Sequence, residues 1–477
     1  VGSEMCIRDR YSTVYQMLSI IVPLITTPYV SRVLGATGIG INAYTYSIVM
    51  YFVLAGGLGI QLYGNREIAY NQRNIEEKSK VFYELVILKF IAIFIASIPY
   101  LIFSMYQGDL KIYFMLQGLA LLGSALDISW YFMGVENFRI LVVRNTIARL
   151  LLLILTFVLV KTADDLWIYI LLTMLAPLLG NLTVWPFLKK EFVPVKFREL
   201  NILRHLKPTL LLFLPQITMM IYLSLNKTML GIMDGVVSAG YYSQSDMIIR
   251  TAFTLVSSFA SAFLPRLSSL FSEKRHSEIK SLTLKSFNLS ATLSILIMAG
   301  IMGVSQTFAV FFFGKDFEEV GSLMFVQSIM ILFVGIAVVA GNQYLLASNR
   351  TKEYTVSVSI GLVVNVIFNF IMIPLFGVMG AVITTVLTEL AVVLYQLWSI
   401  RDVFSLREIL HGFWKYLLAG LATFFVVFNL GQLMNVSVIN YIIQTVLGTS
   451  MYALIVWLLK APIIADIKSI IRLRKKN

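Results

Sequence analysis

The sequence is poor in the residues that build most catalytic and metal sites. Its 477 residues include one cysteine, Cys6, and three histidines, His205, His276 and His411. A single cysteine excludes an intramolecular disulfide and any cysteine-based metal cluster. The histidines all fall in polar connections between hydrophobic runs, which excludes a histidine-rich site inside a membrane.

Charge is also scarce. Asp, Glu, Lys and Arg make up 13% of the chain, whereas 58% is hydrophobic and the mean hydropathy is +0.83. A soluble globular chain is about 25% charged and about 45–50% apolar. Because a membrane helix needs ~20 mostly apolar residues, the chain has room for about fourteen spans. The composition therefore predicts an all-α integral membrane protein and excludes an ordinary soluble enzyme.

Catalytic motifs are absent too. The sequence has no Walker A loop, no HExxH and no GxSxG, so nothing supports ATP hydrolysis on this chain. Asp164 and Asp165 form a paired carboxylate in an outer connection. A membrane polymerase acting on polyprenyl-linked sugars usually needs a larger outer loop than any here. We predict that the protein is not an enzyme and uses no cofactor or metal.

The apolar runs extend along the whole chain. Fourteen are expected, at 11–34, 39–62, 81–104, 112–133, 141–160, 167–187, 209–233, 247–265, 287–313, 320–346, 355–374, 380–399, 415–434 and 439–459. We predict two pseudo-symmetric six-helix bundles joined by a basic cytoplasmic linker, then an extra helix pair and a basic tail. Their ranges are 11–187, 188–208, 209–399, 400–459 and 460–477. Residues 1–10 begin without Met and resemble a foreign or mis-translated leader.

The distribution of Lys and Arg predicts the orientation. One set of alternate connections, together with the C-terminal tail, holds 28 of the 38 basic residues, and the opposite set holds only Lys111, Lys161 and Lys315. Both termini are therefore expected in the cytoplasm of a bacterial cell, with the chain crossing the plasma membrane many times. Attraction to anionic lipid headgroups explains the basic tail and the net charge of +13, without nucleic acid as a partner.

Glycine marks the expected outer turns. Leu34-Gly35, Leu230-Gly231, Phe313-Gly314 and Phe376-Gly377 each end an apolar run, and a second glycine follows each of them. Glycine suits such turns because it tolerates positive φ. The first two instances end the first run of each bundle. Weak internal symmetry of this kind is typical of transporters built from two related bundles.

Basic residues inside the runs are candidate binding residues, because a charge at the bilayer centre costs about 2.5–3.5 kcal/mol on insertion scales. Arg32 and Lys227 occupy corresponding positions near the outer ends of the first and seventh runs, and Asn226 precedes Lys227. The further candidates are Lys89, Arg149 and Arg250. The alternative is that these side chains snorkel to water or, for Arg250, pair with Asp246.

Two acids lie within runs, Asp127 and Glu389, and both are candidates for ion coupling. Glu389 lies at the middle of its run, where it must face water or a partner, so it serves either ion coupling or an ion pair between helices. The basic residues outnumber the acids, which predicts a cationic central cavity suited to an anionic headgroup.

Several motifs resemble a known family. The segments 21–35 (IVPLITTPYVSRVLG) and 57–69 (GLGIQLYGNREIA) resemble the opening hairpin of Wzx-type polysaccharide repeat-unit flippases. The segments 226–231 (NKTMLG), 240–244 (GYYSQ), 265–268 (PRLS) and 342–346 (NQYLL), with Gly361 through Gly380, are similar to later spans of that family. The resemblance covers nearly the whole chain from Tyr11.

This resemblance implies the multidrug/oligosaccharidyl-lipid/polysaccharide exporter fold. It implies movement of an undecaprenyl-pyrophosphate-linked oligosaccharide to the outer leaflet by alternating access, for capsular, exopolysaccharide or O-antigen synthesis. A polysaccharide polymerase and chain-length machinery would then be partners beside the lipid bilayer. The alternatives are a drug/cation antiporter of the same fold and a flippase for the peptidoglycan lipid precursor, because fold alone does not settle the substrate.

Overall fold

The structure is a computed structural model that describes residues 2–261 and 263–466, and these residues form helices and no strand. Val1 of the expected leader and the expected tail from 467 onward lie outside them. Nine of the described helices or helix runs are long and apolar enough to cross a membrane, and two bent pairs raise this number to eleven. The chain is therefore an all-helical, multi-pass membrane protein, as its composition predicts.

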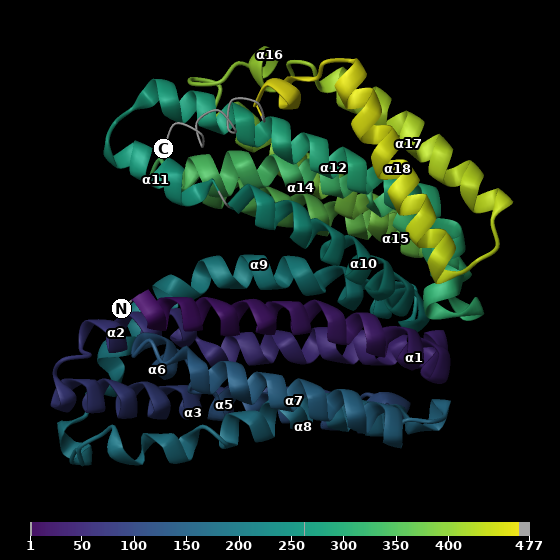
Figure 1. The fold of residues 1–477 in the computed structure, drawn as a ribbon. Helices are drawn as coiled ribbons and strands as arrows, with labels where there is room; N and C mark the ends of the chain where they lie inside the picture. Colours follow the sequence, from purple (N-terminus) through teal and green to yellow (C-terminus); the bar gives the residue numbers. More distant parts are fainter. Residues whose placement is uncertain (1, 262, 467–477) are drawn as a thin grey trace. The chain divides into compact units, whose positions relative to one another are not determined.

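The chain divides into two compact units, Val1–Gly240 and Tyr241–Asn477, which are described separately (Figure 1). The first unit holds α1 to α9 and the start of α10. Its helices are α1 (Gly2–Gly57), α2 (Ile60–Tyr70), α3 (Ile75–Met105), α4 (Lys111–Gln117), α5 (Leu119–Leu126), α6 (Ser129–Gly134), α7 (Phe138–Leu159), α8 (Leu166–Leu182) and α9 (Leu206–Met233). Short 3-10 turns precede α4, α8 and α9, and the connection from α8 to α9 holds two more.

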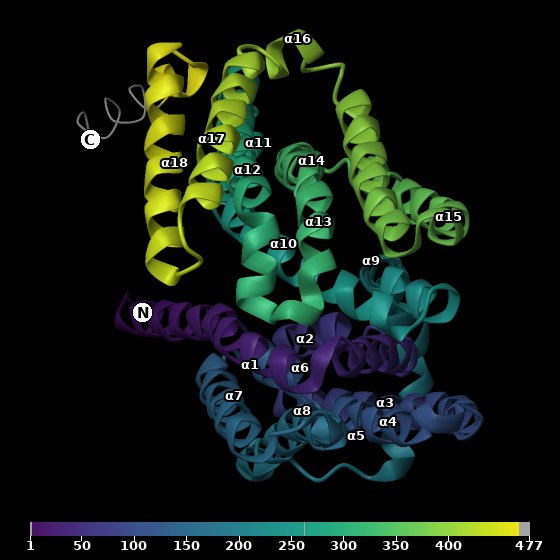
Figure 2. The same cartoon turned by 90° about the vertical axis from the view of Figure 1, so that its right-hand side faces the viewer.

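The second unit contains the remaining helices. These are the rest of α10 (Val236–Ser261), α11 (Leu264–Ser272), α12 (His276–Phe313), α13 (Glu318–Gln327), α14 (Ile329–Ala337), α15 (Thr351–Ser399), α16 (Leu406–Ile409), α17 (Phe413–Leu433) and α18 (Val438–Leu458). A π-helix, Val338–Leu345, follows α14 directly. Figure 2 shows α17 and α18 lying side by side, and α17 also packs against α12.

Glycine interrupts the two longest helices. Gly35 within α1 has φ 65° and Gly377 within α15 has φ 54°, so each of these helices consists of two segments. Gly314, with φ 108°, ends α12. The prediction of a turn at Gly231 is wrong. Gly231 lies inside α9, and the residue with a positive φ, of 100°, is Gly235 instead.

Gly231 serves close packing rather than a turn. A methyl group at this position would lie 2.0 Å from the ring of Tyr44, on the second segment of α1. Similarly, a methyl group at Gly40 would lie 2.0 Å from the carbonyl oxygen of Val236, and Gly240 packs against Gly40 itself. The corresponding glycine motifs of the two predicted repeats therefore pack against each other.

This packing places α9 and the start of α10 in the first compact unit. The sequence predicts that the second bundle begins at 209, whereas the compact unit ends at Gly240. The difference has a physical cause, because the small residues let the α9–α10 connection approach the backbone of α1. Helix pairs in membranes commonly use small residues for such contacts.

Candidate substrate site

The segment around Lys227 is anchored to α1 by hydroxyl groups. The Thr228 hydroxyl lies 2.8 Å from the Ser47 hydroxyl and 2.9 Å from that of Tyr51. Asn226 is buried and Lys227 is half-buried. Since α9 is held directly after this position, by Thr228 against Ser47 and Tyr51 and by Gly231 against Tyr44, the backbone fixes where the Lys227 side chain begins.

Arg32 and Arg149 lie on neighbouring helices but at different levels. Arg32 is exposed, one turn before Gly35, and Arg149 is half-buried on α7. Tyr29 joins the two helices: its ring centroid lies 4.4 Å from that of Phe157, and its hydroxyl donates to the carbonyl of Val160 at 2.6 Å. Arg149 lies eight residues before Phe157, about 12 Å along α7. Arg32 lies within one turn of Tyr29.

Lys89 and Asp127, predicted for different roles, meet inside the first unit. Lys89 is buried, and its Nζ donates to the backbone carbonyl of Asp127 at 2.7 Å. The Asp127 carboxylate in turn accepts from the backbone N–H of Ser129 at 2.9 Å and from the Ser129 hydroxyl. Asp127 directly follows α5 and Ser129 begins α6. The side chains of Asp127 and Ser129 therefore stabilise a helix break that the single expected run 112–133 does not predict.

Arg250 and Asp246 form an ion pair in the second unit. Arg250 Nε lies 2.8 Å from both carboxylate oxygens of Asp246, one turn earlier on α10. Gln327 of α13 donates to the same carboxylate at 3.1 Å and accepts from the Ser245 hydroxyl at 2.6 Å. The pairing of Arg250 with Asp246 matches the alternative raised from the sequence, and Gln327 is the partner that sequence reasoning missed.

Glu389 is 8% exposed on the second segment of α15. Its neighbour Thr388 accepts from Asn365 of the first segment at 3.4 Å, and Asn369 donates to Asn365 at 3.0 Å. A row of amides and hydroxyls therefore joins the two segments beside Glu389. Such groups stabilise helix contacts in membranes by roughly 1 kcal/mol each.

Arg144 falls within the expected run 141–160 and lies in the second turn of α7. Its guanidinium donates to Asn181 Oδ1 at 2.8 Å and, at 2.8 and 3.0 Å, to Asn145 Oδ1. Asn181 donates to the carbonyl of Gly123, which ties α5, α7 and α8 together. The sequence signal for this cluster is the presence of asparagines within apolar runs, Asn145 in 141–160 and Asn181 in 167–187.

The basic linker is fixed to the first unit at its end. His205 is buried, with Nε2 2.7 Å from a Glu84 carboxylate oxygen and Nδ1 2.9 Å from the Tyr63 hydroxyl. Arg204 forms a 2.7 Å ion pair with Glu84. Burial lowers the pKa of His205, although the Glu84 carboxylate opposes this shift.

Among the described residues, no group of three or more His, Cys, Asp or Glu could hold a metal ion.

Comparison with solved structures identifies the fold. The lipid II flippase MurJ, in an inward closed conformation, superposes with a TM-score of 0.75 at 16% identity, covering 93% of this chain and 97% of MurJ. An inward-facing multidrug resistance MATE family transporter of the MOP superfamily gives a TM-score of 0.58 at 15% identity, covering 80% of this chain and 98% of the transporter. The chain therefore shares the fold of these transporters.

Comparison of sequences identifies the family. A protein from Shigella dysenteriae named "Putative O-antigen transporter" is 25% identical over 385 residues, covering 80% of this chain and 96% of that protein. A protein of the same name from Escherichia coli (strain K12) is 24% identical over 404 residues, covering 82% of this chain and 95% of that protein. The model of the family described as "Polysaccharide biosynthesis protein" matches residues 10–271, more than half of the chain. The predicted resemblance to Wzx-type flippases is thereby confirmed, and the chain belongs to this polysaccharide biosynthesis family of membrane transporters.

Proposed function

We propose that this protein moves undecaprenyl-pyrophosphate-linked oligosaccharide repeat units from the inner to the outer leaflet. The observation that carries the proposal is the similarity to two proteins named as O-antigen transporters over at least 80% of the chain, combined with the fold of a lipid flippase. We propose further that fourteen spans form two six-helix bundles and a C-terminal pair, as the apolar runs predict. The bias of Lys and Arg supports cytoplasmic termini.

In the proposed mechanism the two bundles alternate between inward-open and outward-open states. Lys227 and Arg32, assisted by Asn226 and then by Arg250 and Arg149, attract the pyrophosphate and any sugar acids, whereas Lys89 holds the backbone carbonyl of Asp127. The isoprenoid tail remains in lipid through a lateral opening. With the inside of the cell negative, moving each negative charge outward gains about 2.3 kcal/mol per 100 mV.

Among the basic residues, Lys227 and Arg32 are the first to test, because they occupy corresponding positions near the outer ends of the first and seventh runs. Lys89 and Arg250 each have a structural contact, to the Asp127 carbonyl and to the Asp246 carboxylate respectively. For ion coupling, the contacts of the Asp127 carboxylate with Ser129 make Glu389 the better candidate. A carboxylate that takes up and releases a proton must not be committed to holding a helix break.

Reconstitution into proteoliposomes tests the proposal. A fluorescent undecaprenyl-pyrophosphate oligosaccharide should equilibrate between leaflets, as read by a quencher added outside. Lys227→Ala and Arg32→Ala should each slow this movement about tenfold or more, since a hydrogen bond to a charged group is worth about 1.5–3 kcal/mol. Lys111→Ala, at the exposed start of α4, is the matched control.

Two outcomes would overturn the proposal. If both cavity variants move the lipid at the wild-type rate, the cationic cavity is wrong. If wild-type protein moves no lipid-linked glycan but exports a cationic dye, the protein is a drug antiporter. Movement of the lipid-linked peptidoglycan precursor alone would assign that precursor as the substrate instead.

A further inference from the structure

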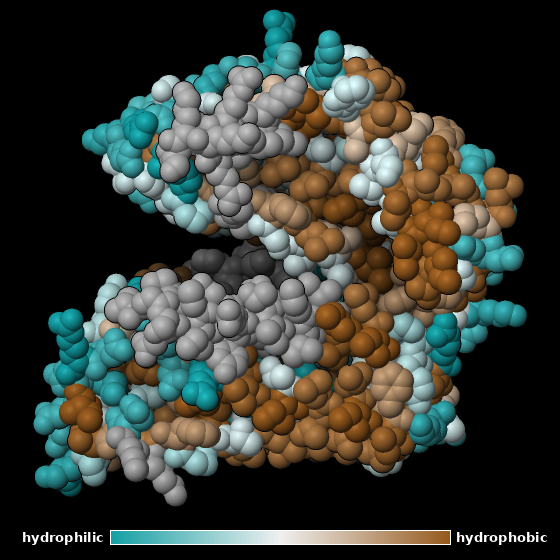
Figure 3. Space-filling view, viewed as in Figure 1, coloured by the Kyte–Doolittle hydropathy of each residue, from teal (hydrophilic) through white to brown (hydrophobic). Residues whose placement is uncertain are grey.

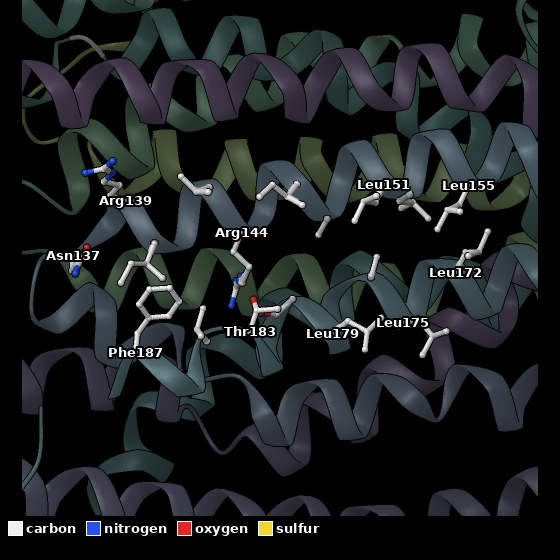
Figure 4. A pocket seen from close by; sticks show the side chains of 18 residues that line it. Asn137, Arg139, Arg144, Leu151, Leu155, Leu172, Leu175, Leu179, Thr183 and Phe187 are labelled. Carbon is white, nitrogen blue, oxygen red and sulfur yellow. The ribbon is translucent and has the colours of Figure 1, made fainter. Parts of the chain in front are cut away.

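An open groove of about 850 Å³ runs between α7 and α8, and its lining includes neither Lys227 nor Arg32 nor Arg149. Figure 4 shows its two ends: Asn137 and Arg139 lie at one end, Leu155 and Leu172 lie at the other, and Arg144 lies between them. The volume is within the range of about 300–1,000 Å³ that is typical of sites for small ligands. The groove is thus polar and cationic at one end and aliphatic along the rest.

The walls of this groove face the lipid of the membrane. Ile147, Leu151 and Leu179 are each more than half exposed, although they lie in helices apolar enough to span a bilayer. On the face shown in Figure 3, hydrophobic residues gather over α7 and α8 between hydrophilic ends. A ligand held here therefore reaches the groove from the bilayer, not from water.

The cationic end suits a phosphate group. Arg144 donates to Asn145, to Asn181 and, at 3.4 Å, to the Ser129 hydroxyl of α6, and these contacts orient its guanidinium group. Arg139 is exposed, one residue after the start of α7. Guanidinium groups bind phosphate oxygens in a planar, often bidentate arrangement. The α7 end that carries both arginines belongs to the basic set of connections, which the positive-inside rule places in the cytoplasm.

The length of the groove distinguishes one class of anionic lipid from another. From Arg139 to Leu155 the lining of α7 covers about 24 Å, at ~1.5 Å per residue. One leaflet contributes about half of a ~30 Å hydrocarbon core. A phospholipid chain in the cytoplasmic leaflet ends near the midplane, so a single one cannot follow the groove along its whole length. A long polyprenyl chain can.

We propose that this groove binds the polyprenyl pyrophosphate of the lipid carrier, with the phosphates at Arg139 and Arg144 and the isoprenoid chain along α7 and α8. The inference rests on the proposed function for its ligand. It adds a site on the lipid-facing surface of the first unit, where the carrier is held in the cytoplasmic leaflet. The sugar headgroup then remains at the cytoplasmic surface.

Photo-crosslinking of the full chain in phosphatidylcholine nanodiscs tests this site. A benzophenone amino acid replaces Leu151 in the groove or, as the matched control, Ile95 on the exposed face of α3. The probe is radiolabelled undecaprenyl pyrophosphate. We expect at least threefold more adduct at 151 than at 95. Excess unlabelled probe should abolish it, and the same mole fraction of phosphatidylglycerol should not.

The arginine end is tested by Arg139→Gln, which should reduce the adduct at 151 about threefold to tenfold. Lys352→Gln, exposed at the start of α15, is the control for loss of one positive charge. Because Arg139 is exposed and contributes no core packing, its replacement should leave the melting temperature unchanged. Arg144→Gln is a second variant, interpreted only if it is folded.

Equal labelling at 151 and 95 would show ordinary boundary lipid and overturn the proposal. Competition by phosphatidylglycerol as strong as that by the unlabelled probe would also overturn it, in favour of a phospholipid site. The proposed function is judged separately by flipping in proteoliposomes. Flipping without selective labelling at 151 would overturn the proposed groove site alone. Selective labelling without flipping would overturn the proposed function alone.

Discussion

At the scale of single residues, Lys89 shows how a lysine is accommodated inside a membrane-spanning helix. The sequence identifies Lys89 as a charge within an apolar run. Its partner could not be predicted, because the acceptor is the backbone carbonyl of Asp127, 38 residues later. Backbone acceptors leave no signature in a sequence. The break between α5 and α6 that exposes this carbonyl is equally hidden, because no glycine or proline marks it.

We expect Lys89→Met to destabilise the protein by about 1–3 kcal/mol, since the carbonyl of Asp127 loses its donor. Thermal unfolding of the purified protein measures this loss. The flipping rate per folded molecule should be unchanged, which distinguishes a structural lysine from one that binds substrate. Lys352→Met at an exposed site provides the comparison. A wild-type melting temperature combined with slow flipping would instead place Lys89 in the binding site.

At the scale of helices, hydrophobic runs predict where spans lie but not how they contact one another. The positive φ expected at Gly231 occurs at Gly235, and Gly231 packs on Tyr44. A sequence pattern shows that glycine is present. Only the packing shows whether it is needed for a turn or for a close approach. The same limit explains why the expected boundary at 209 differs from the compact unit that ends at Gly240.

Two glycine substitutions separate these roles. Gly231→Ala places a methyl group 2.0 Å from the ring of Tyr44, so we expect a loss of about 1–3 kcal/mol from overpacking. Gly300→Ala in α12 meets no atom within 4 Å, and alanine favours a helix over glycine by about 0.8–1.0 kcal/mol. Melting temperatures should therefore move in opposite directions. Equal stability of the two variants would contradict the packing of α9 against α1.

At the scale of the whole molecule, composition predicts a multi-pass membrane protein and the motifs predict its family, both of which are confirmed. The candidate site is less predictable. Arg32, Lys227 and Glu389 are visible as charges in apolar runs, and the sequence also raises the pairing of Arg250 with Asp246, but it does not reveal the contact that holds Lys89. Nor does the sequence reveal a lipid-facing groove, because its leucines resemble those of any membrane helix.

The predicted orientation is open to direct measurement. In a Cys6→Ser background, which contains no other cysteine, one exposed residue is replaced on each predicted side. Asp164→Cys should react with a membrane-impermeant maleimide in intact cells, and Arg198→Cys should react only after permeabilisation, because the basic connections face the cytoplasm. The reverse pattern of labelling would show that the predicted topology is inverted. The membrane potential could then no longer be said to favour transport of the negative charges.

The glycine breaks in α1 and α15 also bear on how the protein is made. A single residue, Gly35 or Gly377, joins the two segments of each helix. In Figure 1 the chain runs out along the first segment of α1 and returns along the second. No water-exposed loop separates the two segments. The first segment therefore cannot insert across the bilayer while the second segment remains in water. We expect the biosynthetic machinery to release each of these pairs into the lipid together, as one hairpin.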